Sequence, residues 1–163
     1  MTHTRIPEGC QNRDRPMGST YHSIHFHLVF STKNRKPFID AAWRRQLHEY
    51  LGGTVKGLGG VPEAVGGVED HVHLLVSLKT TVAPSDVVRE LKKASSVWAA
   101  ENHCKGFAWQ EGYSIFSLSW KHVDVVRSYI ANQEDHHRKT SFREEFKRML
   151  ERNGVEYDPQ YLP

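Results

Sequence analysis

The sequence predicts an α+β fold built on one four-stranded antiparallel sheet. Three observations lead to this prediction. Apolar residues alternate along strand-like segments, longer segments between them carry apolar residues at helical spacing, and the elements follow one another in the order β-α-β-β-α-β-α. The chain has 163 residues, the length of one ordinary domain, and its content of 38% hydrophobic residues excludes disorder as a description of the whole chain.

The first half of the pattern is a strand, a helix and a hairpin. Residues 21–31 alternate between apolar and more polar side chains, as a strand with one buried face does. Asp40 is placed to cap a following helix, which a glycine-rich segment at 57–60 ends. A short strand within 61–68 and a clearer strand over 70–78 are close enough in sequence to pair as a hairpin.

The second half repeats the alternation of helix and strand. Pro84 opens a helix with apolar residues spaced for burial, which ends near Asn102. Residues 107–118 are rich in aromatic and polar strand formers, and 123–132 resume helical spacing. A short amphipathic helix is expected around 142–150 within a charged tail.

With right-handed crossovers, this order predicts a ferredoxin-like sheet whose first and third strands lie side by side at the centre. Helices should cover its apolar face. The opposite face would carry four histidines, and the extra helix after the fourth strand is free to cross it: His25, His27, His71 and His73. We divide the chain into a flexible N-terminal extension (1–18), the domain (19–135) and a charged C-terminal helix and tail (136–163).

Charge and hydropathy narrow the function classes. The net charge of +3 permits nucleic-acid binding without demonstrating it. No segment approaches the roughly 20 apolar residues of a membrane helix, and the first nineteen residues lack the apolar core of a signal peptide, so we expect a cytoplasmic protein without membrane partners. Cys10 and Cys104 are far apart in sequence and predict neither a disulfide framework nor a cysteine zinc site.

The chain contains 11 histidines, and this enrichment indicates a functional site, because imidazole is a common metal ligand and titrates near neutral pH. His71 and His73 are two residues apart on a predicted strand, so their side chains project from one face and can bind one metal ion together. His25 and His27 have the same spacing, so spacing alone does not say which pair would hold metal. Surface histidines on a solvated sheet produce the same pattern. Asp70 beside the second pair is placed to orient an imidazole or to end a tight turn.

Tyr129 and Gln133 are four residues apart and should lie on one face of the last predicted domain helix. A tyrosine suits reversible phosphodiester cleavage, because the phosphotyrosine ester keeps the bond energy of the broken linkage. Its phenol, with a pKa of about 10, needs a cation that polarises the phosphate. A packed aromatic and a solvent-facing glutamine are the plainer alternatives. Tyr113 is a rival nucleophile without a ligand-type neighbour.

The segment DHVHLLV, followed about 55 residues later by YIANQ, resembles the single-tyrosine HUH (His-hydrophobe-His) transposases of bacterial insertion sequences and their repeat-associated relatives. The resemblance runs from about Ser19 to roughly Phe146. It implies a ferredoxin-like fold, His71, His73 and Gln133 as metal ligands, and Tyr129 as the nucleophile that forms a 5′-phosphotyrosine. It also implies single-stranded DNA with hairpins as substrate, Mg²⁺ or Mn²⁺ as cofactor, and a homodimer, although repeat-associated relatives also act as monomers.

Imidazoles favour transition ions whereas Mg²⁺ prefers oxygen ligands, so Mn²⁺ reconciles the two preferences best. Basic side chains are candidates for neutralising DNA phosphates, and Trp109 or Tyr113 for stacking on bases. The basic candidates are Lys33, Arg35, Lys36, Arg89, Lys92, Lys93, Arg138 and Lys139. Two other functions stay open: a noncatalytic hairpin-binding module of the same fold, and an RNA-binding sheet, which would carry aromatic residues where the histidines are expected.

Overall fold

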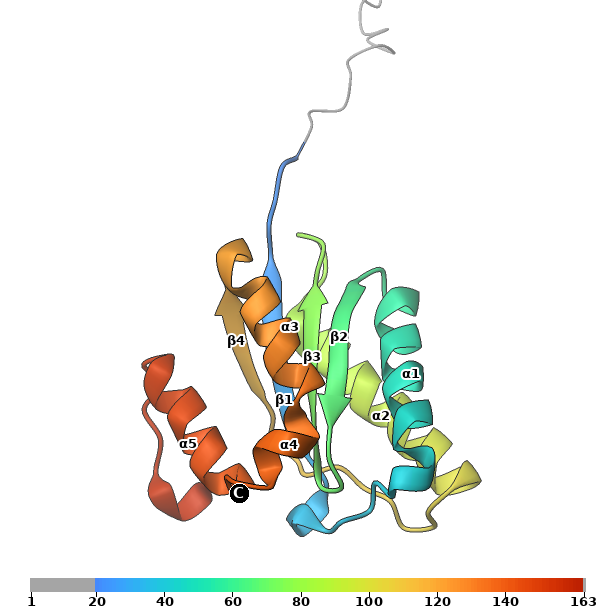
Figure 1. Cartoon of the computed structure of the whole chain (residues 1–163). Coiled ribbons are helices and arrows are strands. Elements are labelled where there is room, and N and C mark those ends of the chain that lie inside the picture. The colour runs from blue at the N-terminus through green and yellow to red at the C-terminus, as the bar shows by residue number, and fades with distance from the viewer. Residues whose placement is uncertain (1–19, 163) are drawn as a thin grey trace, which may run out of the picture.

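The computed structural model describes residues 20–162, so the predicted extension over 1–18 lies outside the described residues. Figure 1 shows one sheet with helices on both faces. Its elements are β1 (His25–Ser31), α1 (Ala41–Gly57), β2 (Val61–Gly67), β3 (His71–Ser77), α2 (Pro84–Asn102), β4 (Ser114–Leu118), α3 (Val123–Ala131), α4 (Gln133–His137) and α5 (Phe142–Arg152). The strand order is β2-β3-β1-β4, with every neighbouring pair antiparallel. The predicted ferredoxin-like fold is confirmed.

Two strands are shorter than predicted. β1 begins at His25 rather than at residue 21. β4 covers only the end of the 107–118 segment, and Trp109 contributes an isolated bridge to Thr32. The reason for the second difference is Lys92, whose ammonium donates to three successive backbone carbonyls, those of residues 110–112. These carbonyls point to the lysine and not to a neighbouring strand.

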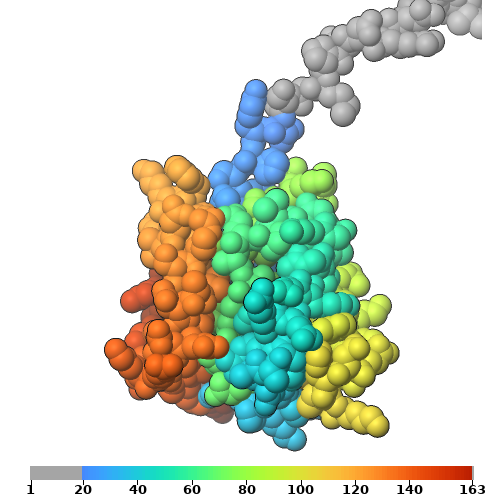
Figure 2. All heavy atoms as spheres, turned by 45° about the vertical axis from the view of Figure 1, so that its right-hand side comes forward, coloured from blue at the N-terminus to red at the C-terminus, as the bar shows by residue number. Residues whose placement is uncertain are grey.

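The larger core lies between the sheet and the pair α1 and α2. Leu28 of β1 and Leu74 of β3 are buried there against Leu47 of α1 and Leu91 of α2. Asp40 caps α1 as predicted, because its carboxylate accepts from the amide of Ala42. Figure 2 shows α1 and the end of α2 together on one side of the molecule. Arg44 of α1 reaches α4, where it donates to Glu134 at 2.8 Å.

The other face of the sheet is covered by the C-terminal helices. Ile130 of α3 packs on Leu75 of β3, while Phe142 and Leu150 of α5 pack on Val29 of β1. A reciprocal cap between Ser141 and Glu144 begins α5. The histidine face of the sheet is therefore enclosed by side chains from α3 and α5 rather than open to solvent.

His48 on α1 is expected to make the fold acid-sensitive. Burial, followed by the charge of Arg44, lowers the pKa of His48 to about 4, and Glu134 opposes them weakly. The folded chain then binds fewer protons than the unfolded chain between pH 6.5 and 4. The stability contributed by neutral His48 is present above pH 6.5 and is lost as the pH falls to about 4, by up to about 3 kcal/mol.

His48→Gln should therefore lose less stability than the parent between pH 7 and 4.5, as followed by thermal unfolding. Because burial lowers the pKa of His27 and His137 as well, part of the pH dependence should remain. Substituting the exposed His22 by Gln is the control and should leave the pH profile unchanged. Identical profiles for the parent and His48→Gln would contradict this assignment.

Candidate active site

β3 places His71 and His73 side by side on the face covered by α3 and α5, and both are fully buried. Their neighbours on β1 are Ser31 and Val29. His73 Nδ1 shares a hydrogen bond of 2.9 Å with His27 Nε2. Burial, reinforced by the surrounding histidines, holds the pKa of His73 well below its usual value, so this imidazole is neutral and able to act as a ligand.

Asp70 fixes the orientation of His71. Its Oδ1 lies 2.7 Å from His71 Nδ1, and its Oδ2 accepts from Arg35 Nη2 at 2.7 Å and from Nε at 3.1 Å. Burial alone would raise the pKa of Asp70, but these hydrogen bonds outweigh it and lower the pKa. A charged acceptor at Nδ1 keeps the proton there, so the lone pair of His71 Nε2 faces the site. Both roles predicted for Asp70 are present, because it bonds the imidazole of His71 and also stands in the tight connection between β2 and β3. Its backbone carbonyl also accepts from Thr32.

Tyr129 and Gln133 reach the histidine pair from two helices, not one. The prediction that one continuous helix carries both residues is wrong, because α3 ends at Ala131 and Gln133 begins α4. Asn132 leaves the helical conformation, and its side-chain amide donates to the carbonyl of Ser128. Gln133 Oε1 nevertheless lies 3.4 Å from His71 Nε2, and the ring centroids of Tyr129 and His73 are 5.7 Å apart.

Glu145 of α5 lies at the centre of this cluster and was not among the residues predicted from the sequence. It is 3% exposed. Its Oε1 accepts from the Tyr129 hydroxyl and, at 3.0 Å, from Gln133 Nε2, while its Oε2 lies 2.9 Å from His137 Nε2. Burial, with a smaller effect of Asp70, raises the pKa of Glu145 to about 8 against the opposing charge of Arg148. Among the described residues, no lysine or arginine lies within ion-pair distance of this carboxylate, whose close basic neighbours are histidines.

The donor atoms of this cluster suit a divalent cation. Ligand atoms of His71, His73, His137 and Glu145 all lie within 4.8 Å of one another. Among the described residues, Nε2 of His73, Nε2 of His137 and Oε2 of Glu145 have no hydrogen-bond partner, since the short approach of His137 to Glu145 is not aligned for a hydrogen bond. Buried polar atoms without partners are rare in native proteins, and one shared ion would give a partner to all three.

A groove between α3 and α5 gives access to the cluster. Tyr129 and Glu145 line it together with the exposed, basic Arg148 and Arg152 of α5. These two arginines were also absent from the predicted DNA contacts. The groove joins the phenol of Tyr129 to a positively charged surface, which suits an anionic chain such as a phosphodiester backbone.

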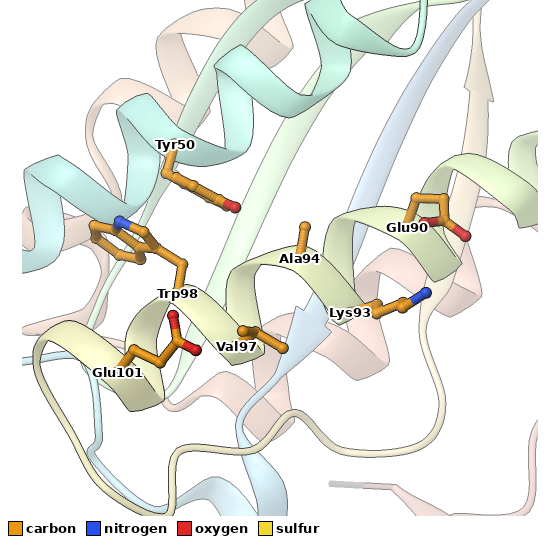
Figure 3. A pocket seen from close by; sticks show the side chains of 7 residues that line it. All are labelled: Tyr50, Glu90, Lys93, Ala94, Val97, Trp98 and Glu101. Carbon is orange, nitrogen blue, oxygen red and sulfur yellow. The ribbon is translucent and has the colours of Figure 1, made fainter.

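The predicted DNA contacts fall into two groups. One group lies near the site: Lys33, Arg35 and Lys36 follow β1, and Arg138 and Lys139 follow His137. The other group, Arg89, Lys92 and Lys93, is on α2, beyond the opposite face of the sheet. Figure 3 shows Lys93 beside a hollow in which Tyr50 of α1 and Trp98 of α2 stack, with ring centroids 4.8 Å apart.

Trp109 and Tyr113, the two candidates for base stacking, are placed differently. Trp109 is buried in the core, where its indole donates to Ser95 Oγ at 2.9 Å, so it cannot stack on a base. Tyr113 is 42% exposed and lies in a groove that Phe146 of α5 also lines.

Among the described residues, no helix has the length and apolar character needed to cross a membrane.

A family model described as "Transposase IS200 like" matches residues 20–133. The chain belongs to the IS200-like transposase family. The resemblance found in DHVHLLV and YIANQ is thereby confirmed, and both segments lie within the matched residues. No curated protein matches the chain.

Two solved structures of transposases share the fold. One, from Deinococcus radiodurans R1 and assigned as a transposase, is 24% identical, covers 73% of this chain and 98% of its own, and has a TM-score of 0.57. The other is a REP-associated tyrosine transposase bound to a REP hairpin, which is 16% identical, covers 90% of this chain and 92% of its own, and has a TM-score of 0.57. The second likeness extends over more of this chain than the residues matched by the family model.

Proposed function

We propose that this family member cleaves and rejoins single-stranded DNA through a 5′-phosphotyrosine at Tyr129. The observation that carries the proposal is the arrangement of Tyr129 and Gln133 around the buried His71 and His73 within one chain. We assign His71, His73 and Gln133 as ligands of a divalent ion, with Mn²⁺ favoured over Mg²⁺ by the imidazoles. When bound, this ion would polarise the scissile phosphate and offset the charge of the transition state.

In the proposed cleavage, the phenolic oxygen of Tyr129 attacks the phosphorus of the target linkage. A bond forms between this oxygen and phosphorus, and the bond from phosphorus to the 3′ oxygen breaks. The proton of the phenol leaves as the bond forms, and the departing 3′ oxygen takes up a proton to become a hydroxyl. The 5′ side of the DNA stays esterified to Tyr129. Attack by a 3′ hydroxyl on this ester reverses the reaction without an energy source.

Side chains of this chain prepare the phenol and the DNA for the step. The hydrogen bond from the Tyr129 hydroxyl to Glu145 and the contact with His73 hold the ring in the cluster. Arg148 and Arg152 in the access groove are suited to bind the phosphates that flank the cleaved bond. Because Tyr129 meets the histidines of its own chain, we propose that it acts in cis, and a homodimer is not required for a complete site.

We take the DNA substrate to carry hairpins, because a solved structure with this fold is a complex with a REP hairpin. Four basic residues near the histidine end of the sheet are the proposed contacts to the phosphate backbone of the hairpin. They are Lys33, Lys36, Arg138 and Lys139. The alternative function is a noncatalytic module that binds hairpins without cleaving them. Only the cleaving enzyme forms a covalent link between protein and DNA, so this product distinguishes it from the noncatalytic module.

The test incubates purified protein with single-stranded oligonucleotides from the flanks of its own gene, with Mn²⁺ or with EDTA. We expect an adduct that survives denaturing electrophoresis in Mn²⁺ and is absent in EDTA. The matching oligonucleotides of the complementary strand serve as controls for strand choice. Hairpin binding without an adduct on either strand would support the noncatalytic module. An adduct of equal yield in EDTA would contradict the metal assignment.

A further inference from the structure

The unexplained part of the cluster is His137 of α4 and Glu145 of α5, which lie beyond the residues matched by the family model. His137 and Glu145 come from two separate elements and both turn inward, Glu145 almost completely buried among exposed, charged neighbours on its helix. Without a paired cation, a buried glutamate takes up a proton or costs free energy, and apolar side chains would fill the same space more favourably. A cation bound beside Glu145 would keep its carboxylate ionised.

We propose that His137 and Glu145 are metal ligands that complete the site begun by His71 and His73. The inference rests on the proposed function, because it assigns further ligands to the same ion. Together with the Gln133 oxygen assigned above, three imidazoles and one carboxylate form a donor set that favours Mn²⁺ or Zn²⁺ over Mg²⁺. The C-terminal segment is then part of the metal centre and not only a cover over the sheet.

Distances between the donor atoms agree with a shared ion. Glu145 Oε2 lies 3.7 Å from His71 Nε2 and 2.9 Å from His137 Nε2, and Glu145 Oε1 lies 3.7 Å from His73 Nε2. Two ligands at bond lengths of about 2.1 Å in a tetrahedral site are roughly 3.4 Å apart. The pairs that include Glu145 bracket this separation, and all ligand atoms of the group lie within 4.8 Å of one another. Side-chain adjustments that close the wider pairs would bring all of them to one ion.

The hydrogen bonds around the cluster leave the required lone pairs free. Asp70 holds the proton of His71 on Nδ1, which leaves the lone pair of its Nε2 free. The lone pair of His73 Nε2 is free in the tautomer in which His73 Nδ1 donates to His27 Nε2. Gln133 donates its amide to Glu145, which turns its own carbonyl oxygen toward His71 Nε2. An oxygen and a nitrogen acceptor that face each other at 3.4 Å repel unless a cation lies between them.

His136 provides a matched control within the same segment. Its Nε2 lies 3.6 Å from Glu145 Oε1 and also lacks a hydrogen-bond partner among the described residues. It is not a member of the group whose ligand atoms all lie within 4.8 Å of one another. Comparing His136→Ala with His137→Ala therefore separates metal ligation from a general effect of histidines near Glu145. For Glu145, the exposed Glu151 on the same helix is the control.

The experiment titrates Mn²⁺ into the full chain after removal of metal with EDTA and measures affinity by calorimetry. We expect one site in the parent chain, and affinity at least about 10-fold weaker in Glu145→Gln and in His137→Ala. His136→Ala and Glu151→Gln should stay within about twofold of the parent. Co²⁺ is the second probe: its visible absorption should change on binding to the parent and differ in Glu145→Gln, which reports on ligation independently of activity.

Parent-like Mn²⁺ affinity in both Glu145→Gln and His137→Ala would overturn this inference and leave the proposed function standing, provided that the parent forms the DNA adduct. Equal weakening by His136→Ala and His137→Ala would also overturn it, since the effect would then not be ligation. A parent chain that binds neither Mn²⁺ nor Co²⁺ would contradict the assignment of metal to the whole site. Circular dichroism of each variant shows whether it is folded.

Discussion

Tyr129→Phe is expected to remove the covalent DNA adduct completely, a loss of at least about a thousandfold in yield. The change deletes one oxygen and keeps the aromatic ring that packs edge-on against His73 and His27. It also removes one hydrogen bond to Glu145, which retains the donor from Gln133, so stability should change by only about 1–2 kcal/mol. Hairpin binding, measured by gel shift, should remain at the level of the parent chain.

Tyr113→Phe is the matched control for this experiment. Tyr113 is the rival tyrosine of the sequence, and it is exposed beside β4, away from the four-residue ligand group. Its substitution should leave adduct yield unchanged. If Tyr129→Phe forms the adduct at the parent yield while Tyr113→Phe does not, the roles of the two tyrosines are reversed and the proposed mechanism is wrong.

Gly66→Ala is expected to disturb the site indirectly, because Gly66 has no side chain that could contact the proposed ligands. Gly66 of β2 pairs with His73 of β3, and a methyl group at residue 66 would lie 2.5 Å from the backbone oxygen of Ile130. Ile130 is buried and follows Tyr129 in α3. The absence of a side chain at Gly66 thus lets α3 approach the sheet beside the histidine pair.

The added methyl cannot be accommodated by rotating a flexible side chain, because it meets backbone. We expect a loss of about 1–3 kcal/mol, which lowers the melting temperature by several degrees. A displacement of Tyr129 by about 1 Å should also reduce the rate of adduct formation by about 100-fold. The measurements are thermal unfolding and single-turnover adduct formation under saturating Mn²⁺.

Gly53→Ala is the control, and its expected effect on stability has the opposite sign. Gly53 is exposed within α1, and a methyl group there meets no atom within 4 Å. Removing a glycine from a helix interior should raise stability by up to about 1 kcal/mol and leave adduct formation unchanged. If Gly66→Ala behaves like Gly53→Ala in both measurements, the close approach of α3 to β2 is not what positions Tyr129.

The sheet and its helices were predicted well because the patterns that specify them lie within short stretches of sequence. Alternation along β3 placed His71 and His73 on one face. The cap by Asp40 marked the start of α1, and Pro84 in the first turn marked the start of α2. The break at Asn132 was missed, since helical spacing continues through it and only the observed hydrogen bonds to Ser128 and Tyr129 reveal the end of α3. Trp109 was equally ambiguous until its contact with Ser95 placed it in the core.

Glu145 could not be predicted because it joins the site only through tertiary packing. On α5 it is one acidic residue in a run of charged ones. Its one signal is spacing, since it lies three residues after Phe142 and four before Met149, on the apolar side of the helix, whereas Glu144 takes part in the cap. Its inward direction follows from the packing of Phe142 and Leu150 on the sheet. For His137 a weak signal was present, since it lies four residues after Gln133, the spacing that puts two helical side chains on one face.

The most direct measurement is mass spectrometry of the adduct after nuclease and protease digestion. The proposed function predicts that the remaining nucleotide is attached through its 5′ phosphate to the peptide that contains Tyr129, and that fragmentation places the added mass on this side chain. A nucleotide attached to another residue, or joined through a 3′ phosphate, would contradict it.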